Sequence, residues 1–276
     1  MRWLGEDFSG GFFRRIYAPS NPGGLWWALM VAVVLTVLHQ LLQIAFVLIL
    51  LGFALVFKLD LNVSHEVTKA ALVSVLPASL IVAALGWWLA GKRGGRAAEV
   101  LGLRWPKLTV LGWAALVASF ILVMYAAITA IVFIFHIDMS QYTPGPDGQS
   151  PKTGSAGAVK EAMFDIANEP WVFALVFPAI AIGAPLAEEV IFRGQLFSAL
   201  SQTRLGVAGA TLLTALMWSL MHVTEPWLSV GLIFVMGLVF GYLIYRFGSL
   251  WVTIVCHGIW NGFYALLIFF VLGGGA

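Results

Sequence analysis

The chain has 276 residues, of which 61% are hydrophobic and only 10% are Asp, Glu, Lys or Arg. Soluble domains typically contain roughly 45–50% apolar and about 25% charged residues. A soluble body of this length would lack the charges to cover its surface, so the composition predicts an all-α, multi-pass transmembrane protein. The net charge of +2 is too small for a nucleic-acid footprint. The single cysteine, Cys256, excludes an internal disulfide.

Seven apolar runs predict the spans of a helical bundle, because crossing the hydrocarbon core takes about 20 residues. Six of the runs meet or approach this length, and the fifth is short. A bundle of about seven spans is therefore expected. The runs are 24–57, 67–90, 109–135, 171–200, 207–222, 228–245 and 250–272.

The chain divides into four parts along these runs. Residues 1–23, rich in Gly, Pro and aromatic side chains, predict either an interfacial or a disordered segment. Residues 24–135 predict three accessory transmembrane helices. Residues 136–170 predict a flexible loop or lid, in which 158–168 can form a short helix. The last part, 171–272, contains the polar residues that carry the functional argument.

The distribution of Lys and Arg predicts a cytoplasmic N-terminus. With that orientation, eleven of the fifteen basic residues fall in inner segments. The cluster of Lys92, Arg93 and Arg96 determines the orientation of the first half of the chain. The expected location is the bacterial cell (inner) membrane.

Two adjacent carboxylates lie deep inside an apolar run, where ionisable residues are costly and therefore point to function. Glu189 precedes Arg193 by four residues, the favourable order for an ion pair on a helix. Glu188 points about 100–140° away from that pair. We therefore interpret Glu189 as structural and Glu188 as an unpaired candidate general base. The alternative is a packing network of all three residues.

Two further pairs place polar side chains four residues apart on one helix face. His257 and Asn261 present an imidazole and an amide that can both donate hydrogen bonds, which suits stabilisation of an oxyanion. Trp218 is expected to pack beside His222 and hold its ring. His39, in the first span, is interpreted as a packing residue.

Together these residues resemble the CPBP family, which contains CAAX-prenyl proteases and bacteriocin-processing enzymes. The shared features are EExxxR, aromatic-xxx-His and His-xxx-Asn in successive apolar segments, with the family more often having Phe as the aromatic residue. The resemblance covers about 171–272. The three motifs are Glu188-Glu189-Val190-Ile191-Phe192-Arg193, Trp218-Ser219-Leu220-Met221-His222 and His257-Gly258-Ile259-Trp260-Asn261.

The resemblance implies an intramembrane glutamic endopeptidase whose catalytic core is 171–272. By the resemblance, Glu188 and His222 activate the attacking water, and His257 and Asn261 hold the oxyanion. The implied substrate is a membrane-associated protein or peptide in the lipid bilayer. No cofactor is implied, no prenyl pocket is visible in the sequence, and the oligomeric state stays open.

Three residues are expected to support the site rather than react, and one difficulty concerns its depth. The supporting residues are Glu189, Arg193 and Trp218. Straight spans would separate Glu188 and His222 by about 10 Å or more in depth, at 1.5 Å per residue. Prolines and a glycine in the fourth run therefore predict a helix that breaks and re-enters at the site.

Two other functions compete with the glutamic protease. Glu188, His222 and His257 could ligate zinc in a metalloprotease, although no HExxH motif occurs in the chain. A non-enzymatic immunity or scaffold protein of the membrane, or an ion path, would also use intramembrane polar residues.

Overall fold

The computed structural model describes residues 2–18, 20–57, 63–138, 166 and 169–272 as an all-helical bundle without a strand in these ranges. The expected helix or lid at 158–168 lies outside the described residues, apart from Ile166. The long helices are α1 (Gly24–Val56), α2 (Val63–Ala90), α4 (Val110–Ile134), α9 (Gly206–Leu220), α10 (Trp227–Phe247) and α11 (Leu250–Leu267).

A further long helix runs from Pro170 to Leu200 and contains two wider, π-helical stretches. A short helix, α3, connects α2 to α4. The segments are α3 (Ala97–Val100), α6 (Pro170–Pro178), π-helical η5 (Ala179–Gly183), α7 (Ala184–Glu189), π-helical η6 (Val190–Leu196), α8 (Phe197–Leu200) and, after α11, π-helical η7 (Ile268–Leu272).

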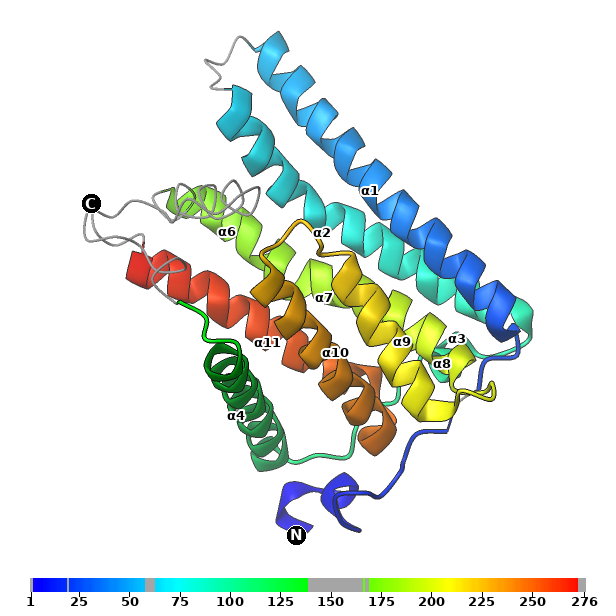
Figure 1. Cartoon of the computed structure of the whole chain (residues 1–276). Coiled ribbons are helices and arrows are strands. Elements are labelled where there is room, and N and C mark those ends of the chain that lie inside the picture. The colour runs from blue at the N-terminus through cyan, green and yellow to red at the C-terminus, as the bar shows by residue number, and fades with distance from the viewer. Residues whose placement is uncertain (1, 19, 58–62, 139–165, 167–168, 273–276) are drawn as a thin grey trace.

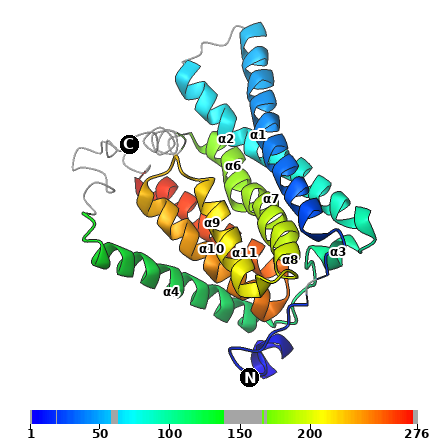
Figure 2. The ribbon, with the colours of Figure 1, turned by 45° about the vertical axis from the view of Figure 1, so that its right-hand side comes forward.

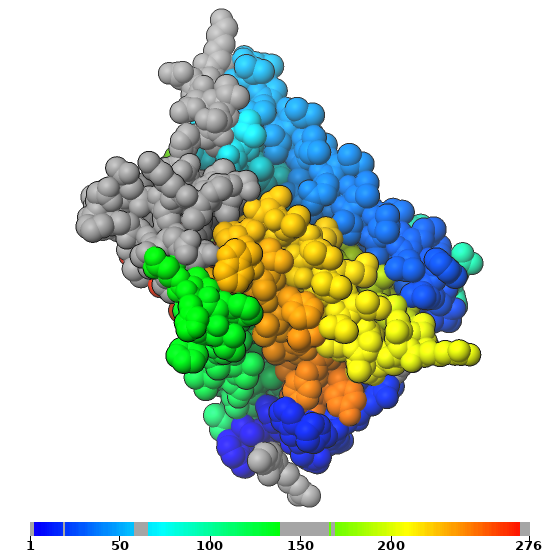
Figure 3. Space-filling view, viewed as in Figure 1, coloured from blue at the N-terminus to red at the C-terminus, as the bar shows by residue number. Residues whose placement is uncertain are grey.

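The helix of α6–α8 occupies the middle of the bundle (Figure 1). The hairpin of α1 and α2 packs on one side of it, and α9, α10 and α11 pack on the other. Helix α4 lies along the outer flank of the last three helices (Figure 2), where it contacts α10 and α11. The space-filling view shows α9 and α10 forming the centre of one face, between α4 and α1 (Figure 3).

The expected all-α, multi-pass bundle is confirmed, with six candidate spans where about seven were expected. Six helices of the described residues are long and apolar enough to cross a membrane, and the short apolar helix 206–220 is the seventh element. The short helix is the expected fifth run, and it ends two residues earlier than predicted.

The interruption expected in the fourth span takes the form of π-helical turns, and the predicted re-entry is wrong. The helix continues from Pro170 to Leu200 without reversing direction. Pro185 cannot donate a backbone hydrogen bond, and the widened turn before it accommodates this loss without breaking the helix.

The predicted depth difference between the motifs is also wrong. The loop 201–205 joins α8 to α9 as a tight hairpin. Glu188 lies twelve residues before the end of α8 at Leu200, and Trp218 lies twelve residues after the start of α9 at Gly206. At 1.5 Å per residue both are about 18 Å from the hairpin. The end of α9 and Glu188 therefore lie at similar depth, so no re-entry is needed.

The N-terminal segment packs against the helix ends at which α10 finishes. Asp7 accepts a hydrogen bond of 2.6 Å from Arg104, and the Tyr17 hydroxyl lies 3.2 Å from that of Ser201. Tyr17 is buried, which raises its pKa to about 12. The position of this segment at a membrane interface remains a prediction.

Candidate active site

The site is built around the π-helical turn that precedes Pro185. The backbone N–H of Ala184 bonds to the carbonyl of Ala179, five residues back. The carbonyl of Ile180 would need Ala184 or Pro185 as its helical donor, but the first is used and the second has no N–H. Ile180 therefore presents a free backbone acceptor to the neighbouring helix α11.

Helix α11 packs a face of small and polar side chains against this turn and donates a hydrogen bond to the freed carbonyl. The side-chain amide of Asn261 donates a hydrogen bond of 3.3 Å to the carbonyl of Ile180. A Cβ atom on Gly258 would lie 2.5 Å from the carbonyl oxygen of Ala181, so only glycine permits this approach. Asn261 and Gly258 together fix where α11 crosses the helix of α6–α8.

Glu189 is fully buried and joins two helices. Its Oε1 atom lies 3.1 Å from Nη1 of Arg193 and 3.1 Å from Nδ1 of His257. The pairing with Arg193 matches the sequence interpretation, whereas the contact with His257 was not predicted. Because the carboxylate accepts, Nδ1 of His257 carries the proton and Nε2 is the remaining ring nitrogen.

Glu188 is half-buried and forms no salt bridge with the described residues, and its hydrogen-bond partner is the indole of Trp218. The Nε1–H group of Trp218 donates a hydrogen bond of 2.6 Å to Oε2 of Glu188. This places the two carboxylates of the EE motif in different surroundings, as their helical positions indicate. The sequence interpretation gave Trp218 only a packing role and missed this hydrogen bond.

Trp218 also orders the rest of the site. Its ring lies edge-on to His222 and His257, at centroid distances of 5.8 and 5.2 Å, and the guanidinium of Arg193 lies 4.2 Å from its ring centre. The backbone carbonyl of Trp218 accepts a hydrogen bond of 2.9 Å from Nδ1 of His222. The free nitrogen of His222 is therefore Nε2, which can accept a proton.

A cavity of about 510 Å³ brings the predicted residues together. Glu188, His222, His257 and Asn261 all line it, as does Trp218, whereas Glu189 and Arg193 lie behind its wall. The remaining lining is largely apolar. This volume falls within the usual range for ligand pockets, about 300–1,000 Å³.

A second, smaller cavity of about 190 Å³ reaches the other side of Glu188. Helix α1 contributes Thr36, His39 and two glutamines to its lining. His39 lies 2.9 Å from the hydroxyl of Ser79 and 3.3 Å from the amide of Gln43, so both ring nitrogens have partners. These contacts agree with the packing role predicted for His39 and add polar neighbours to the site that the motifs did not indicate.

The described residues contain no group of three or more His, Cys, Asp or Glu side chains arranged to hold a metal ion. The arrangement instead offers a carboxylate and an imidazole acceptor on one side of the cavity and an amide donor on the other. Such a set can take a proton from water and stabilise negative charge on an oxygen.

A comparison with protein families supports the resemblance found in the motifs. Residues 170–263 match the family described as Type II CAAX prenyl endopeptidase Rce1-like. The matched range includes all three motifs, and the CPBP/CAAX protease resemblance is thereby confirmed. No curated protein and no solved structure matches the chain.

Proposed function

We propose that the chain is a glutamic endopeptidase acting within the membrane, a proposal that the match of residues 170–263 to the Rce1-like type II CAAX prenyl endopeptidase family supports. Its substrate is a membrane-associated protein or peptide, and Glu188 activates the water that attacks the peptide bond. The observation that carries this proposal is the shared cavity lined by Glu188, His222, His257 and Asn261.

The first step assigns the proton transfer. A water between Glu188 and His222 loses a proton as it attacks the scissile carbonyl, and either side chain can accept that proton. The Trp218 hydrogen bond supports this role because it holds one oxygen of the Glu188 carboxylate, Oε2, and leaves Oε1 without a hydrogen bond to the described residues. The proton then passes to the leaving amine.

The second step stabilises the tetrahedral intermediate. Asn261 has two amide hydrogens, of which the carbonyl of Ile180 takes one. The second can donate to the developing oxyanion. His257 donates from Nε2 when its ring is doubly protonated, and the buried carboxylate of Glu189 holds the opposite nitrogen in place.

The third step concerns orientation and location. We assign the N-terminus to the cytoplasm and the protein to the bacterial inner membrane, on the basis of the basic residues. The cavity lies beyond the short helix α9 and is lined by Glu225 and Ser229, which adjoin the 221–226 turn. With this orientation, the cavity opens toward the outer face.

The proposal is tested with the Glu188→Gln variant in reconstituted vesicles. Glutamine keeps the shape of the side chain and its acceptor for Trp218, but it cannot act as a base. We expect cleavage of a membrane-anchored reporter peptide to fall by at least about 10²-fold, the lower end for loss of a general base, with an unchanged melting temperature. Glu6→Gln, at an exposed pair with Lys107, is the matched control and should cleave normally.

Near-normal cleavage by Glu188→Gln would remove this residue from the proposed role. Treatment of the intact protein with a strong chelator distinguishes the glutamic protease from the zinc alternative. A glutamic protease retains its activity, whereas a zinc protease loses it. If Glu188→Gln preserves the biological function of the protein in cells while the purified protein cleaves nothing, the non-enzymatic alternative is correct.

A further inference from the structure

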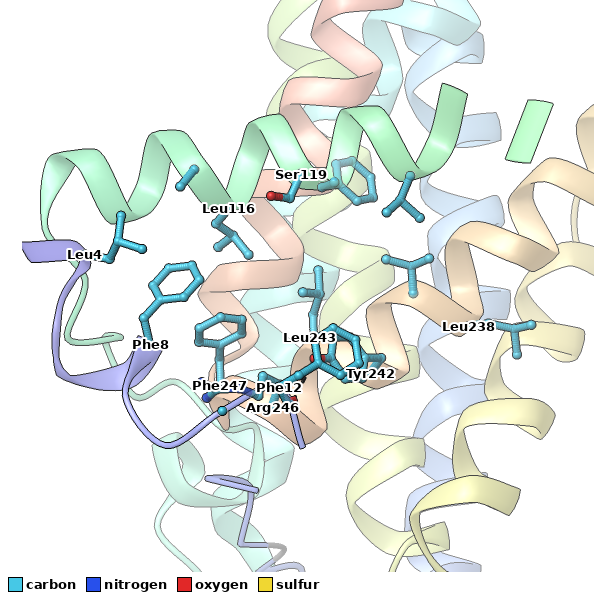
Figure 4. Close-up of a pocket in the computed structure, with 15 residues that line it drawn as sticks. Leu4, Phe8, Phe12, Leu116, Ser119, Leu238, Tyr242, Leu243, Arg246 and Phe247 are labelled. Carbon is cyan, nitrogen blue, oxygen red and sulfur yellow. Dashed lines mark hydrogen bonds between the residues drawn. The ribbon is translucent and has the colours of Figure 1, made fainter. Parts of the chain in front are cut away.

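A second large hollow lies away from the active site, between α4, α10 and the N-terminal segment. This groove has a volume of about 710 Å³. Figure 4 shows side chains from the three segments facing one another across it. Its walls include Leu4 and Phe8 from the N-terminal segment, Leu116 and Phe120 from α4, and Leu243 and Phe247 from α10.

The dimensions of the groove match one leaflet of a bilayer. Along α10 it extends over ten residues from Leu238 to Phe247, a rise of about 14 Å. Half of a hydrocarbon core of about 30 Å is about 15 Å. Because the wall residues are almost all apolar, the groove provides the environment of an acyl chain over this depth.

One end of the groove holds a buried cation that forms no ion pair with any described residue. Arg246 lines the groove in the last turn of α10 and is only 4% exposed. Its Nη1 atom is buried and has no hydrogen-bond partner among the described residues. A buried charge without a partner is strongly destabilising. The position of Arg246 therefore calls for an anion within the groove.

Nearby acidic side chains do not fill this role. Oδ2 of Asp7 accepts hydrogen bonds of 2.6 Å from Arg104 and 2.9 Å from the backbone N–H of Lys107. Glu6 lies on the exposed surface and pairs with the Lys107 side chain. Asp7 thus has other partners, and neither carboxylate forms a hydrogen bond or ion pair with Arg246.

We propose that this groove binds one anionic phospholipid, with its phosphate against Arg246 and an acyl chain along the apolar walls. A transmembrane helix of a partner would cover the same walls, but an apolar helix brings no anion to the buried guanidinium. Arg14, Arg104 and Lys107 lie at this end of the bundle, where they contact Ser9, Phe247 and Glu6 respectively. Clusters of basic residues attract anionic lipid head groups. The site is independent of the protease activity.

The N-terminal segment forms the head-group end of the lipid site. The hydroxyl of Tyr242 donates a hydrogen bond of 2.9 Å to the backbone carbonyl of Phe12, and the two rings stack with centroids 4.8 Å apart. Phe8 packs edge-on against Phe247 at 5.5 Å. A bound lipid would thus contact both α10 and this segment, and it should stabilise their packing.

The test uses the full-length chain purified in detergent and titrated with phosphatidylglycerol or phosphatidylcholine carrying the same acyl chains. Native mass spectrometry counts bound lipid, and thermal unfolding reports its effect on stability. We expect the anionic lipid to bind about tenfold more tightly than the zwitterionic one, since a charged hydrogen bond is worth about one such factor. Arg246→Gln should abolish this preference.

Two further variants keep the result interpretable if Arg246→Gln folds poorly. Ser119 is exposed and lines the groove, so Ser119→Trp should fill the acyl site and weaken binding of both lipids alike. Arg204→Gln removes an exposed positive charge from the loop 201–205 and should leave the preference unchanged.

Several outcomes would overturn the proposal. Equal binding of the two lipids by the wild type would exclude recognition of a head-group charge. An unchanged preference in Arg246→Gln would place the phosphate elsewhere. If inorganic phosphate alone saturated the Arg246 site and Ser119→Trp did not weaken lipid binding, the site would bind an anion and not a lipid. A dimer that Ser119→Trp disrupts would identify a second copy as the occupant.

Discussion

The indole of Trp218 donates a 2.6 Å hydrogen bond to the carboxylate of Glu188, across the contact between α9 and α7. This contact gives the aromatic residue of the second motif a direct part in holding the proposed base. Trp218 itself is only 1% exposed and has Arg193 over its ring. The base is therefore positioned by a side chain that is itself buried and packed against Arg193.

Replacing Trp218 by Phe tests this positioning role. Phenylalanine keeps an aromatic ring in the packed space but has no donor for Glu188. We expect kcat to fall by about tenfold, because a hydrogen bond to a charged group contributes roughly 1.5–3 kcal/mol, while KM changes little. Steady-state kinetics in vesicles measures both constants. Unchanged kcat would mean that packing alone holds Glu188 in place.

A different result is expected for Glu189→Gln. This change leaves Arg193 and His257 without the carboxylate that both contact, in a fully buried position. Removing one partner of a buried ion pair costs about 3–5 kcal/mol, so the melting temperature and the yield of folded protein should fall. Thermal unfolding of the purified protein measures this loss. If Glu188→Gln were the unstable variant and Glu189→Gln the stable one, the assignment of the two carboxylates would be inverted.

How far the sequence predicts this site depends on whether a contact lies within one helix or between two. Glu189 and Arg193 are four residues apart, and helical geometry alone predicts their pairing. The contacts of Glu189 with His257 and of Glu188 with Trp218 join residues 68 and 30 positions apart. The hydrophobic periodicity of one segment cannot predict these contacts, because they depend on how two helices pack against each other.

The depth of the site is a second feature that depends on how the helices pack and that the sequence pattern did not predict. Apolar runs predict which segments are helices in the membrane, and six of these helices have the length of a span. They do not indicate that the shorter helix Gly206–Leu220 ends at the depth of the site. The π-helical turn before Pro185 was likewise expected only as a break, since proline signals a lost hydrogen bond without stating how the chain compensates.

Asn261→Ala separates a catalytic donor from a purely structural one. Removing one oxyanion donor typically lowers kcat by about 10²–10³ with little change in KM, because the hydrogen bond forms in the transition state. Loss of the hydrogen bond to Ile180 should in addition lower the melting temperature. Kinetics and thermal unfolding on the same preparation measure the two effects.

The double variant with His257→Ala adds a control for this assignment. If both residues serve one oxygen, the double variant should lose less than the product of the two single losses. An increase in KM alone for Asn261→Ala would indicate that the residue binds substrate. A lower melting temperature with unchanged kcat would confine Asn261 to its contact with the π-helical turn.

The proposed orientation predicts which loops are accessible from outside the cell. Cys256 is fully buried and should not react with a membrane-impermeant maleimide, so single cysteines can be introduced into the natural background. Val223 is 70% exposed in the turn between α9 and α10, and Arg204 is exposed in the loop 201–205 at the opposite end of α9. With a cytoplasmic N-terminus, Val223→Cys should be labelled in intact cells, and Arg204→Cys only after the membrane is permeabilised. The reverse pattern would place the N-terminus outside and turn the opening of the active-site cavity toward the cytoplasm.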